Sequence, residues 1–242
     1  MNNKLLISIV SHGQGELIRK LIDDMRNWIV PEGLKVSLVV TLNLYENEEF
    51  LQGCPFDLCC VRNVRPRGFG ENHNTAFSLV ESEFFLILNP DLRIEKLNLS
   101  EVLAGLSKDN VGVWAPKVVS GSNNLEDSAR LFPTISIFIK RVLFGIRKKD
   151  YNFGVNPLCV DWVAGMFMII KSNLYRDIKG FDERYFMYLE DADLCKRVQA
   201  QGRSVIWSPS VTVTHDARRA TFKNLQHLKW HLRSAFRFIF GF

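Results

Sequence analysis

Acidic side chains and one histidine follow apolar segments of this sequence. Asp91 comes directly after the apolar run 84–88, the acidic segment 190–193 (EDAD) opens an expected helix, and His215 follows the last apolar strand. A carboxylate in a cleft can take a proton from a reacting hydroxyl. Carboxylate oxygens and imidazole can also bind a divalent cation. Taken alone, each feature is better explained as a turn, a helix cap or a polar surface residue, but their order and contexts together predict a site.

Strands and helices must alternate to position these side chains. The apolar runs predict strands at 4–10, 35–42, 57–62 and 83–88, with helices at 14–28, 46–51 and 72–80 between them. This alternation favours an α/β fold with a parallel, doubly wound sheet. Ligands of such sheets bind beyond the carboxyl ends of the strands. The expected position of Asp91 is therefore a ligand-binding edge.

The second half of the chain is less regular. It predicts a helix at 97–107, a strand at 111–119, an irregular stretch at 120–157, a strand at 160–172 broken at Gly165, a helix ending the stretch 180–202, and a strand pair at 203–214. We expect one domain over residues 1–216, followed by a basic tail over 217–242.

Length and composition fit a single folded domain. The chain has 242 residues, of which 47% are hydrophobic and 24% charged, and its net charge is +5. The positive charge favours anionic partners, or it is simply a solvated basic surface. The five cysteines form no CxxC pair, which argues against a zinc ribbon or a disulfide framework. Reduced thiols are then the simplest interpretation, so we expect a cytoplasmic protein. No apolar run reaches the ~18 residues of a membrane span, so we expect no transmembrane segment, although the protein can still lie on a membrane.

Three stretches resemble a known family. They are LILNPD (86–91), GFDERYFMYLEDADLCKRV (180–198) and VTVTHDARRA (211–220). They are similar to family 2 glycosyltransferases of the GT-A fold, in particular to the rhamnosyltransferase-like enzymes of bacterial surface polysaccharide synthesis. RGFGENHNTAF (67–77) and VDWVAGMFMIIKS (160–172) fit the same family. The resemblance covers about residues 4–216 and implies a mostly parallel central sheet flanked by helices.

The resemblance also implies a reaction. An inverting enzyme of this family moves a sugar from a nucleoside-diphosphate donor to a glycan or lipid-linked acceptor. Asp191 then matches the base that takes the proton of the acceptor hydroxyl. The acceptor side is expected to include Glu190, Asp193, Trp162 and Gly165.

The donor side departs from the family pattern at one position. The family's D-x-D metal motif is Asn89-Pro90-Asp91 here, so one carboxylate is replaced by an amide. By resemblance, Asp91 and His215 bind Mg²⁺ or Mn²⁺. The donor is expected to be linked to dTDP or UDP, and Asn43 occupies the place of an aspartate that contacts the base. The expected nucleotide-sugar contacts are Ser11, His12, Asn43, Arg67, Gly68, Asn74, Asn89 and Asp91.

The tail has the pattern of an amphipathic helix. Apolar residues recur at helical spacing from Phe222 to Ile239, and residues 217–242 contain six lysines and arginines and no acidic residue. Such a helix fits a membrane surface, or it packs back onto the domain. The segment 135–149 is a second candidate patch. A membrane-bound tail places the enzyme at the inner face of the cytoplasmic membrane.

Three other functions are alternatives to this one. A sugar-nucleotide pyrophosphorylase needs a basic, glycine-rich loop after the first strand, but SHGQGE (11–16) has no lysine or arginine. A catalytically degenerate GT-A-fold module that binds glycan or membrane is compatible with Asn89. A nucleic-acid partner is not expected, because no recognition module is present.

Overall fold

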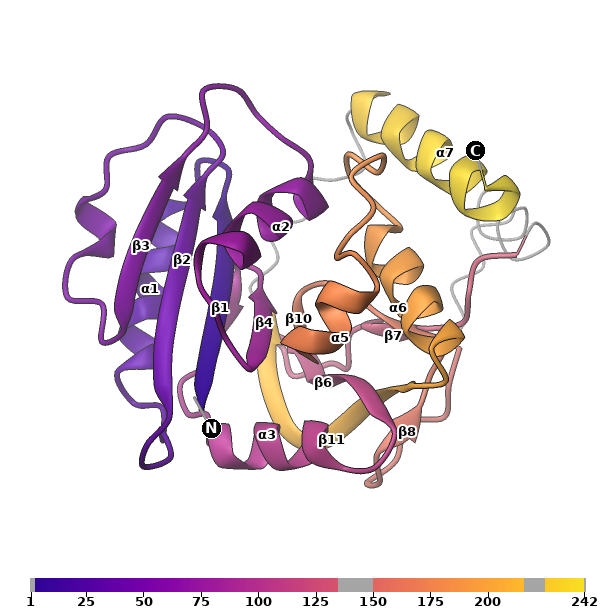
Figure 1. Cartoon of the computed structure of the whole chain (residues 1–242), viewed down its shortest axis with the longest axis horizontal. Helices are drawn as coiled ribbons and strands as arrows, with labels where there is room; N and C mark the ends of the chain where they lie inside the picture. Colours follow the sequence, from indigo (N-terminus) through magenta and orange to yellow (C-terminus); the bar gives the residue numbers. More distant parts are fainter. Residues whose placement is uncertain (1–2, 135–149, 216–224, 242) are drawn as a thin grey trace.

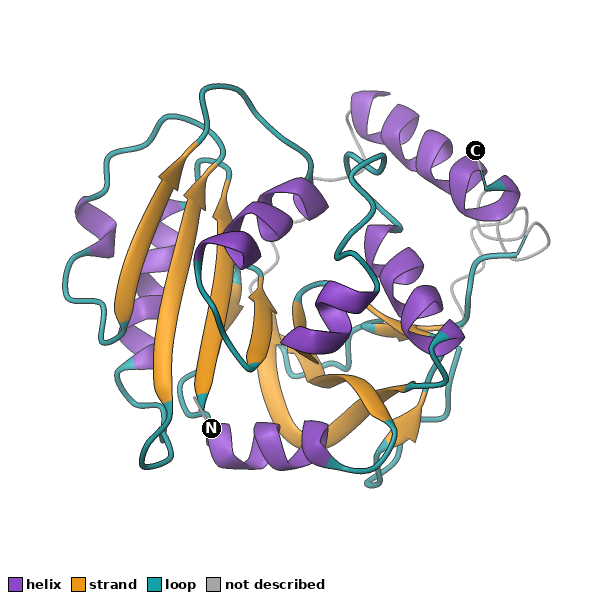
Figure 2. Ribbon diagram, in the orientation of Figure 1, coloured by secondary structure: helices purple, strands orange, loops and turns teal. Residues whose placement is uncertain are grey.

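The fold comes from a computed structural model that describes residues 3–134, 150–215 and 225–241 (Figure 1). The predicted patch at 135–149 and the tail residues 217–224 lie outside these ranges. A sheet runs through the molecule with helices on both faces (Figure 2). Its strand order is β3-β2-β1-β4-β10-β6-β11-β5, and a ninth strand, β8, pairs with β11.

The first half of the sheet is parallel, as predicted. Its strands are β1 (Lys4–Ser11), β2 (Lys35–Leu42), β3 (Asp57–Arg62) and β4 (Phe84–Leu88). Between them lie α1 (Gly15–Met25), the short 3-10 helix η1 (Glu49–Leu51) and α2 (Phe69–Leu79). Strands buried on both faces need near-continuous apolar sequences, which explains why the sequence located β1, β2 and β4 closely, whereas β3 is a largely exposed edge strand.

Helix α2 begins three residues before its predicted start. Gly68 has an extended backbone, and its carbonyl accepts the Asn72 N–H at 3.1 Å. Gly70, expected in the preceding turn, lies in the first helical turn. A Cβ there would come within 2.6 Å of the Phe181 side chain, so close packing explains this glycine better than a turn does.

The second half of the sheet is mixed. Strand β10 (Phe167–Lys171) is antiparallel to both β4 and β6 (Val111–Ser120), and β6 is parallel to β11 (Ser204–His215). The prediction of a mostly parallel sheet therefore holds for the first half, and the second half combines the parallel β6–β11 pair with antiparallel pairings of β10. The shorter strands are β5 (Leu92–Arg93), β7 (Ala129–Arg130), β8 (Leu158–Cys159) and β9 (Trp162–Val163). Strands β7 and β9 form a separate antiparallel pair, and β9 leads into β10, so the predicted break at Gly165 is confirmed.

The predicted strand pair at 203–214 is wrong. Residues Ser204–His215 form one strand, whose register against β6 shifts between Ser208 and Thr212. Pro209 lies inside this shift and has no N–H to donate, which suits an irregular position. The apparent turn is therefore a bulge, and it lets one strand run far enough to bring His215 beside Leu92.

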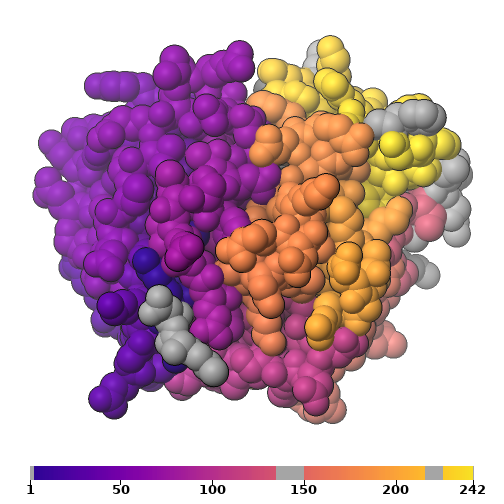
Figure 3. Space-filling view, viewed as in Figure 1, coloured from indigo at the N-terminus to yellow at the C-terminus, as the bar shows by residue number. Residues whose placement is uncertain are grey.

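Two apolar cores lie on opposite faces of the sheet. One includes α1 and α3 (Leu99–Ser107), and the other includes α2, α5 (Ser172–Asp177), α6 (Glu190–Ala200) and α7 (Leu225–Phe240). Helix α7 packs on the domain through the buried residues Ser234, Ala235 and Phe238. It lies at the surface beside the segment around residues 175–200 (Figure 3). Within the described ranges, no helix is both long and apolar enough to cross a membrane.

Candidate active site

The turn at Asn89–Asp91, called the donor corner below, and the predicted base Asp191 are connected through one strand pairing. The backbone N–H of Asn89, at the end of β4, donates to the carbonyl of Met166 at 2.8 Å. The preceding residue, Gly165, donates its N–H to Oδ2 of Asp191 at 3.0 Å. The antiparallel pairing of β4 with β10 therefore brings the Asn89–Asp91 corner beside the residue that holds Asp191.

Asp191 has the environment of a proton acceptor. It lies in the first turn of α6 and is half-buried, and Oδ1 accepts the Ala192 N–H at 2.9 Å. Burial raises the pKa of the carboxyl, although the Gly165 and Ala192 N–H groups act in the opposite direction. A carboxylate whose pKa is raised toward neutrality is a better general base.

Glu190 is buried next to Asp191. Its side-chain atom Oε2 makes no hydrogen bond within the described part of the chain. Burial raises the pKa of Glu190 well above its ordinary value, and the charge of Asp191 raises it further. The two preceding residues, Tyr188 (φ 73°) and Leu189 (φ 64°), are left-handed although neither is glycine. Such backbone strain is characteristic of functional sites, and here it sets the start of α6.

His215 lies between two carboxylates. Its Nε2 is 3.1 Å from Oδ2 of Asp91, and its Nδ1 is 2.9 Å from Oε2 of Glu126. Burial alone lowers the pKa of His215, but hydrogen bonds and charges from Asp91 and Glu126 outweigh it and raise the pKa to about 9. The sequence predicted Asp91 and His215 but missed Glu126, which lies in the stretch expected to be irregular. The backbone N–H of Glu126 donates to the Val118 carbonyl at 2.9 Å, which fixes it beside β6.

The side chains present fit a divalent cation. Oδ1 of Asp91 is buried without a hydrogen-bond partner among the described residues, so it is available as an oxygen ligand. Carboxylate oxygen suits Mg²⁺ and Mn²⁺, and imidazole is an acceptable second ligand. Glu126 can accept the Nδ1 proton, which leaves Nε2 directed at Asp91. No group of three potential ligands is assembled among the described residues.

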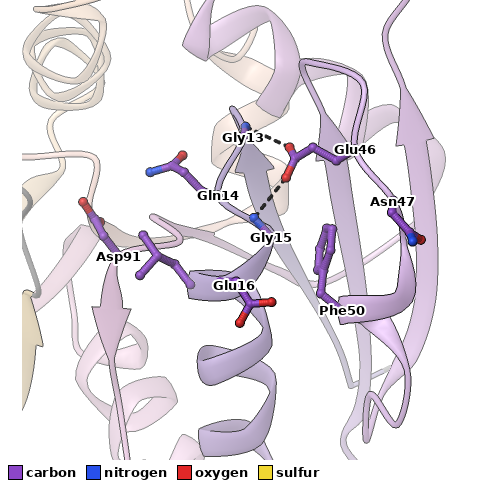
Figure 4. A pocket seen from close by; sticks show the side chains of 9 residues that line it. Gly13, Gln14, Gly15, Glu16, Glu46, Asn47, Phe50 and Asp91 are labelled. Atoms are coloured by element: carbon purple, nitrogen blue, oxygen red, sulfur yellow. Dashed lines mark hydrogen bonds between the residues drawn. The ribbon is translucent and has the colours of Figure 1, made fainter.

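A pocket of about 530 Å³ opens beside Asp91 at the start of α1 (Figure 4). Glu46 holds one wall: its carboxylate accepts from the Ser11 hydroxyl at 2.6 Å and from the Gly13 and Gly15 N–H groups, each at 2.9 Å. Asp91 lies on the opposite side of the pocket (Figure 4). Glu46 was not predicted as a site residue: the sequence placed it at the start of a helix expected over 46–51, and the structure forms a helical turn only at Glu49–Leu51.

The nucleotide contacts expected after β1 and β2 come together in space. Asn43 Oδ1 accepts the Arg67 N–H at 2.8 Å, and its Nδ2 donates to the Arg67 carbonyl at 3.0 Å. Nδ2 also lies 3.3 Å from Nδ1 of His12. Asn43 therefore holds the turn before α2. In that turn a Cβ at Gly68 would lie 3.0 Å from the Phe186 carbonyl oxygen, so glycine is needed for this backbone approach.

Three predicted site residues are engaged in structural contacts. Asn74 uses its amide on the segment 175–183: Nδ2 donates to the Phe181 carbonyl and to Glu183, and Oδ1 accepts from Tyr175 and from the Phe181 N–H. Trp162 is buried and donates its Nε1–H to the Leu131 carbonyl at 2.9 Å. Asp193 pairs with Arg197 at 2.8 Å. These contacts position the surrounding loops.

The chain is similar in sequence to known rhamnosyltransferases. It is 29% identical to rhamnosyltransferase WbbL of Escherichia coli (strain K12), over 96% of this chain and 91% of that protein. It is 24% identical to N-acetylglucosaminyl-diphospho-decaprenol L-rhamnosyltransferase of Mycobacterium tuberculosis (strain CDC 1551 / Oshkosh), over 65% of this chain and 55% of that protein. No family model matches the chain.

Its fold is similar to that of solved glycosyltransferases. The mannosyltransferase PcManGT from Pyrobaculum calidifontis, solved in complex with GDP-Man and Mn²⁺, superposes with a TM-score of 0.62 at 18% identity. The match covers 96% of this chain but 64% of that protein, so this chain spans less than two thirds of its structural relative. These comparisons confirm the predicted GT-A fold and the predicted resemblance to rhamnosyltransferase-like enzymes.

Proposed function

Because this chain is a glycosyltransferase of the GT-A fold that is similar to rhamnosyltransferases, we propose that it transfers a sugar with inversion and that Asp191 is the general base. One observation carries the proposal: Asn89 binds Met166, and the adjacent Gly165 binds Asp191. The donor corner and the base therefore flank one space. An acceptor hydroxyl between them loses its proton to Asp191 as it attacks the anomeric carbon from the face opposite the diphosphate.

The donor is a nucleoside-diphosphate sugar. Asp91 and His215 would hold Mg²⁺ or Mn²⁺, which supplies positive charge for the leaving diphosphate. Ser11, His12, Arg67, Gly68 and Asn89 lie on the nucleotide side. Asn43 acts there by holding the Arg67 backbone. We assign dTDP or UDP as the nucleotide and rhamnose as the sugar, on the strength of the resemblance to rhamnosyltransferases.

The acceptor is a saccharide linked to a lipid, as in the name of the mycobacterial relative. Helix α7 supports contact with a membrane surface. Leu228, Leu232, Phe236 and Phe240 recur every fourth residue and are 55%, 46%, 55% and 50% exposed. Lys229 and Arg233 lie beside this stripe, and α7 has no acidic residue. An amphipathic helix of this kind binds anionic lipid, so we place the enzyme at the inner face of the cytoplasmic membrane.

Calorimetry tests the donor assignment. The wild-type protein and Asp91→Ala are titrated with dTDP, UDP and GDP, each with and without Mn²⁺. We expect metal-dependent binding of dTDP or UDP that is lost in the variant. Binding of none of the three would contradict the proposal and favour the degenerate binding module.

A further inference from the structure

The short strand β7 runs beside the residues that support Asp191. Ala129 pairs with Val163 and Arg130 with Trp162. The Ala164 N–H then donates to the Ser128 carbonyl at 2.8 Å, and the next residue, Gly165, binds Asp191. Met166 continues to the donor corner through Asn89. Residues 164–166, which hold Asp191 through Gly165, therefore contact the Ser128–Arg130 segment at one end and the donor corner at the other.

Arg130 presents a cation at this second end. Its Nε lies 2.9 Å from the Asp127 carboxylate, and its guanidinium carbon is 5.4 Å from the centre of the Trp162 ring. The side chain is 34% exposed, and its two terminal nitrogens make no hydrogen bond to the residues that the structure describes. Two residues further along the chain, the Phe132 ring lies 5.8 Å from the ring of Phe238 in α7, so the segment that carries Arg130 runs beside this helix.

Helix α7 adds two histidines to the same side. The Tyr188 hydroxyl lies 2.8 Å from Nδ1 of His227, and the Tyr188 and His231 rings are 5.1 Å apart. His227 and His231 are four residues apart and so share one face of α7. Tyr188 lies two residues before Glu190, so this face of α7 adjoins the acceptor side of the site.

We infer that Arg130, with His227 and His231 of α7, binds the phosphate that joins the acceptor saccharide to its lipid. This inference rests on the proposed transfer to a lipid-linked saccharide. The acceptor hydroxyl reaches Asp191, and its diphosphate lies toward α7. The lipid then continues to the exposed stripe that begins at Leu228. The donor diphosphate lies at the other end, at Asp91 and His215.

The test measures binding of geranyl diphosphate, a short lipid diphosphate without sugar or nucleotide. Calorimetry is run with dTDP and Mn²⁺ present in excess, so that the donor side is filled. Arg130→Gln is compared with Arg130→Lys and with Arg176→Gln. Arg176 is a matched control, because its guanidinium carbon lies 5.8 Å from the centre of the Phe77 ring, and it lines a separate pocket with Glu81, Ser82 and Glu83. Geraniol replaces the diphosphate in a parallel titration.

A hydrogen bond to a charged group contributes about 1.5–3 kcal/mol. We therefore expect Arg130→Gln to weaken geranyl diphosphate binding by about ten- to a hundredfold. Arg130→Lys should retain part of the affinity, and Arg176→Gln should stay within about twofold of wild type. Geraniol should bind all four proteins equally weakly.

Three results would overturn the inference. In the first, Arg130→Gln binds geranyl diphosphate as tightly as wild type does. In the second, Arg130→Gln weakens binding of geraniol as much as binding of geranyl diphosphate. Either result would mean that Arg130 only packs on Trp162. In the third, wild type no longer binds geranyl diphosphate when dTDP and Mn²⁺ are added, which would place the lipid diphosphate on the donor side. Failure of dTDP itself to bind would count against the donor assignment and leave the comparison of Arg130 variants intact.

Discussion

Glu126 and His215 form a hydrogen bond of 2.9 Å between Oε2 and Nδ1, across 89 residues of sequence. This contact sets the direction in which the other ring nitrogen points, toward Asp91 at 3.1 Å. Histidines that bind metals usually donate their second N–H to a carboxylate, which fixes the ring and increases its basicity. We therefore propose that Glu126 acts through His215, as a residue that positions a metal ligand.

Replacing Glu126 with Gln should weaken divalent cation binding. Loss of such a supporting carboxylate typically costs about 10–100-fold in metal affinity. We expect this loss for Mn²⁺ in the presence of dTDP, measured by electron paramagnetic resonance of the free ion. Glu101→Gln, on the exposed surface of α3, removes the same charge elsewhere and should bind Mn²⁺ like wild type. Equal affinities for wild type and Glu126→Gln would exclude a positioning role.

The buried carboxyl of Glu190 predicts a pH-dependent stability. Its folded pKa is raised, so the folded protein holds this proton to a higher pH than the unfolded chain does. Stability from this group is greatest below the unfolded pKa of about 4.3 and declines as pH rises toward the folded pKa. Glu190→Gln removes the decline.

We therefore expect the Tm of Glu190→Gln to exceed that of wild type by a few degrees at pH 8, and by less at pH 5. A penalty of about 1 kcal/mol corresponds to about 2–4 °C for a chain of this size. Differential scanning calorimetry at both pH values measures the difference. If the Tm difference between Glu190→Gln and wild type were the same at pH 5 and pH 8, burial of Glu190 would not disfavour its ionised form.

Asn74→Ala should unfold the protein more easily without changing nucleotide affinity. The substitution removes four hydrogen bonds that tie α2 to Tyr175, Phe181 and Glu183. We expect a loss of about 2–4 kcal/mol in urea unfolding, because the buried Tyr175 hydroxyl also loses its acceptor. Asn173→Ala, an exposed residue on α5, is the control. Unchanged stability together with weaker dTDP binding would instead support a nucleotide contact.

The sequence predicted the parallel half of the fold well for a physical reason. The strands at 4–10, 35–42 and 83–88 are short, largely apolar runs bounded by polar loops, and they pair with their neighbours in the first half of the sheet. The antiparallel pairing of β10 with β4 could not be predicted, because the sequence does not specify which edge of the parallel strands a later strand joins. The same limit hid Glu126, whose role follows from the meeting of β6 and β11.

The candidate site was predicted unevenly. Asp91, Asp191 and His215 drew attention in the sequence because each follows or opens a regular element, and their roles in the site stay predictions. Asn74 and Trp162 were placed in the site by resemblance alone, and the structure engages both in hydrogen bonds within the fold. Arg130 gave no sequence signal, since its position depends on the β7–β9 pairing.

The exposed stripe of α7 predicts binding to anionic vesicles. Burial of a Leu or Phe side chain contributes about 1.5–3 kcal/mol, so Leu232→Glu and Phe236→Glu should each reduce vesicle binding by at least tenfold. Sedimentation with phosphatidylglycerol vesicles measures it. Leu79→Glu is a matched control, because Leu79 is 51% exposed at the end of α2. An equal reduction in the control would argue against a specific role for α7.

The most direct test of Asp191 as the general base is to measure both the transfer rate and the donor affinity of Asp191→Asn. The amide keeps the shape of the side chain but cannot accept the hydroxyl proton. Loss of a general base costs about 10²–10⁴ in rate. We predict this loss in transfer from dTDP-rhamnose to a lipid-linked saccharide, with dTDP affinity in Mn²⁺ unchanged. A transfer rate within tenfold of wild type, at equal donor affinity, would contradict the role of Asp191 as the base.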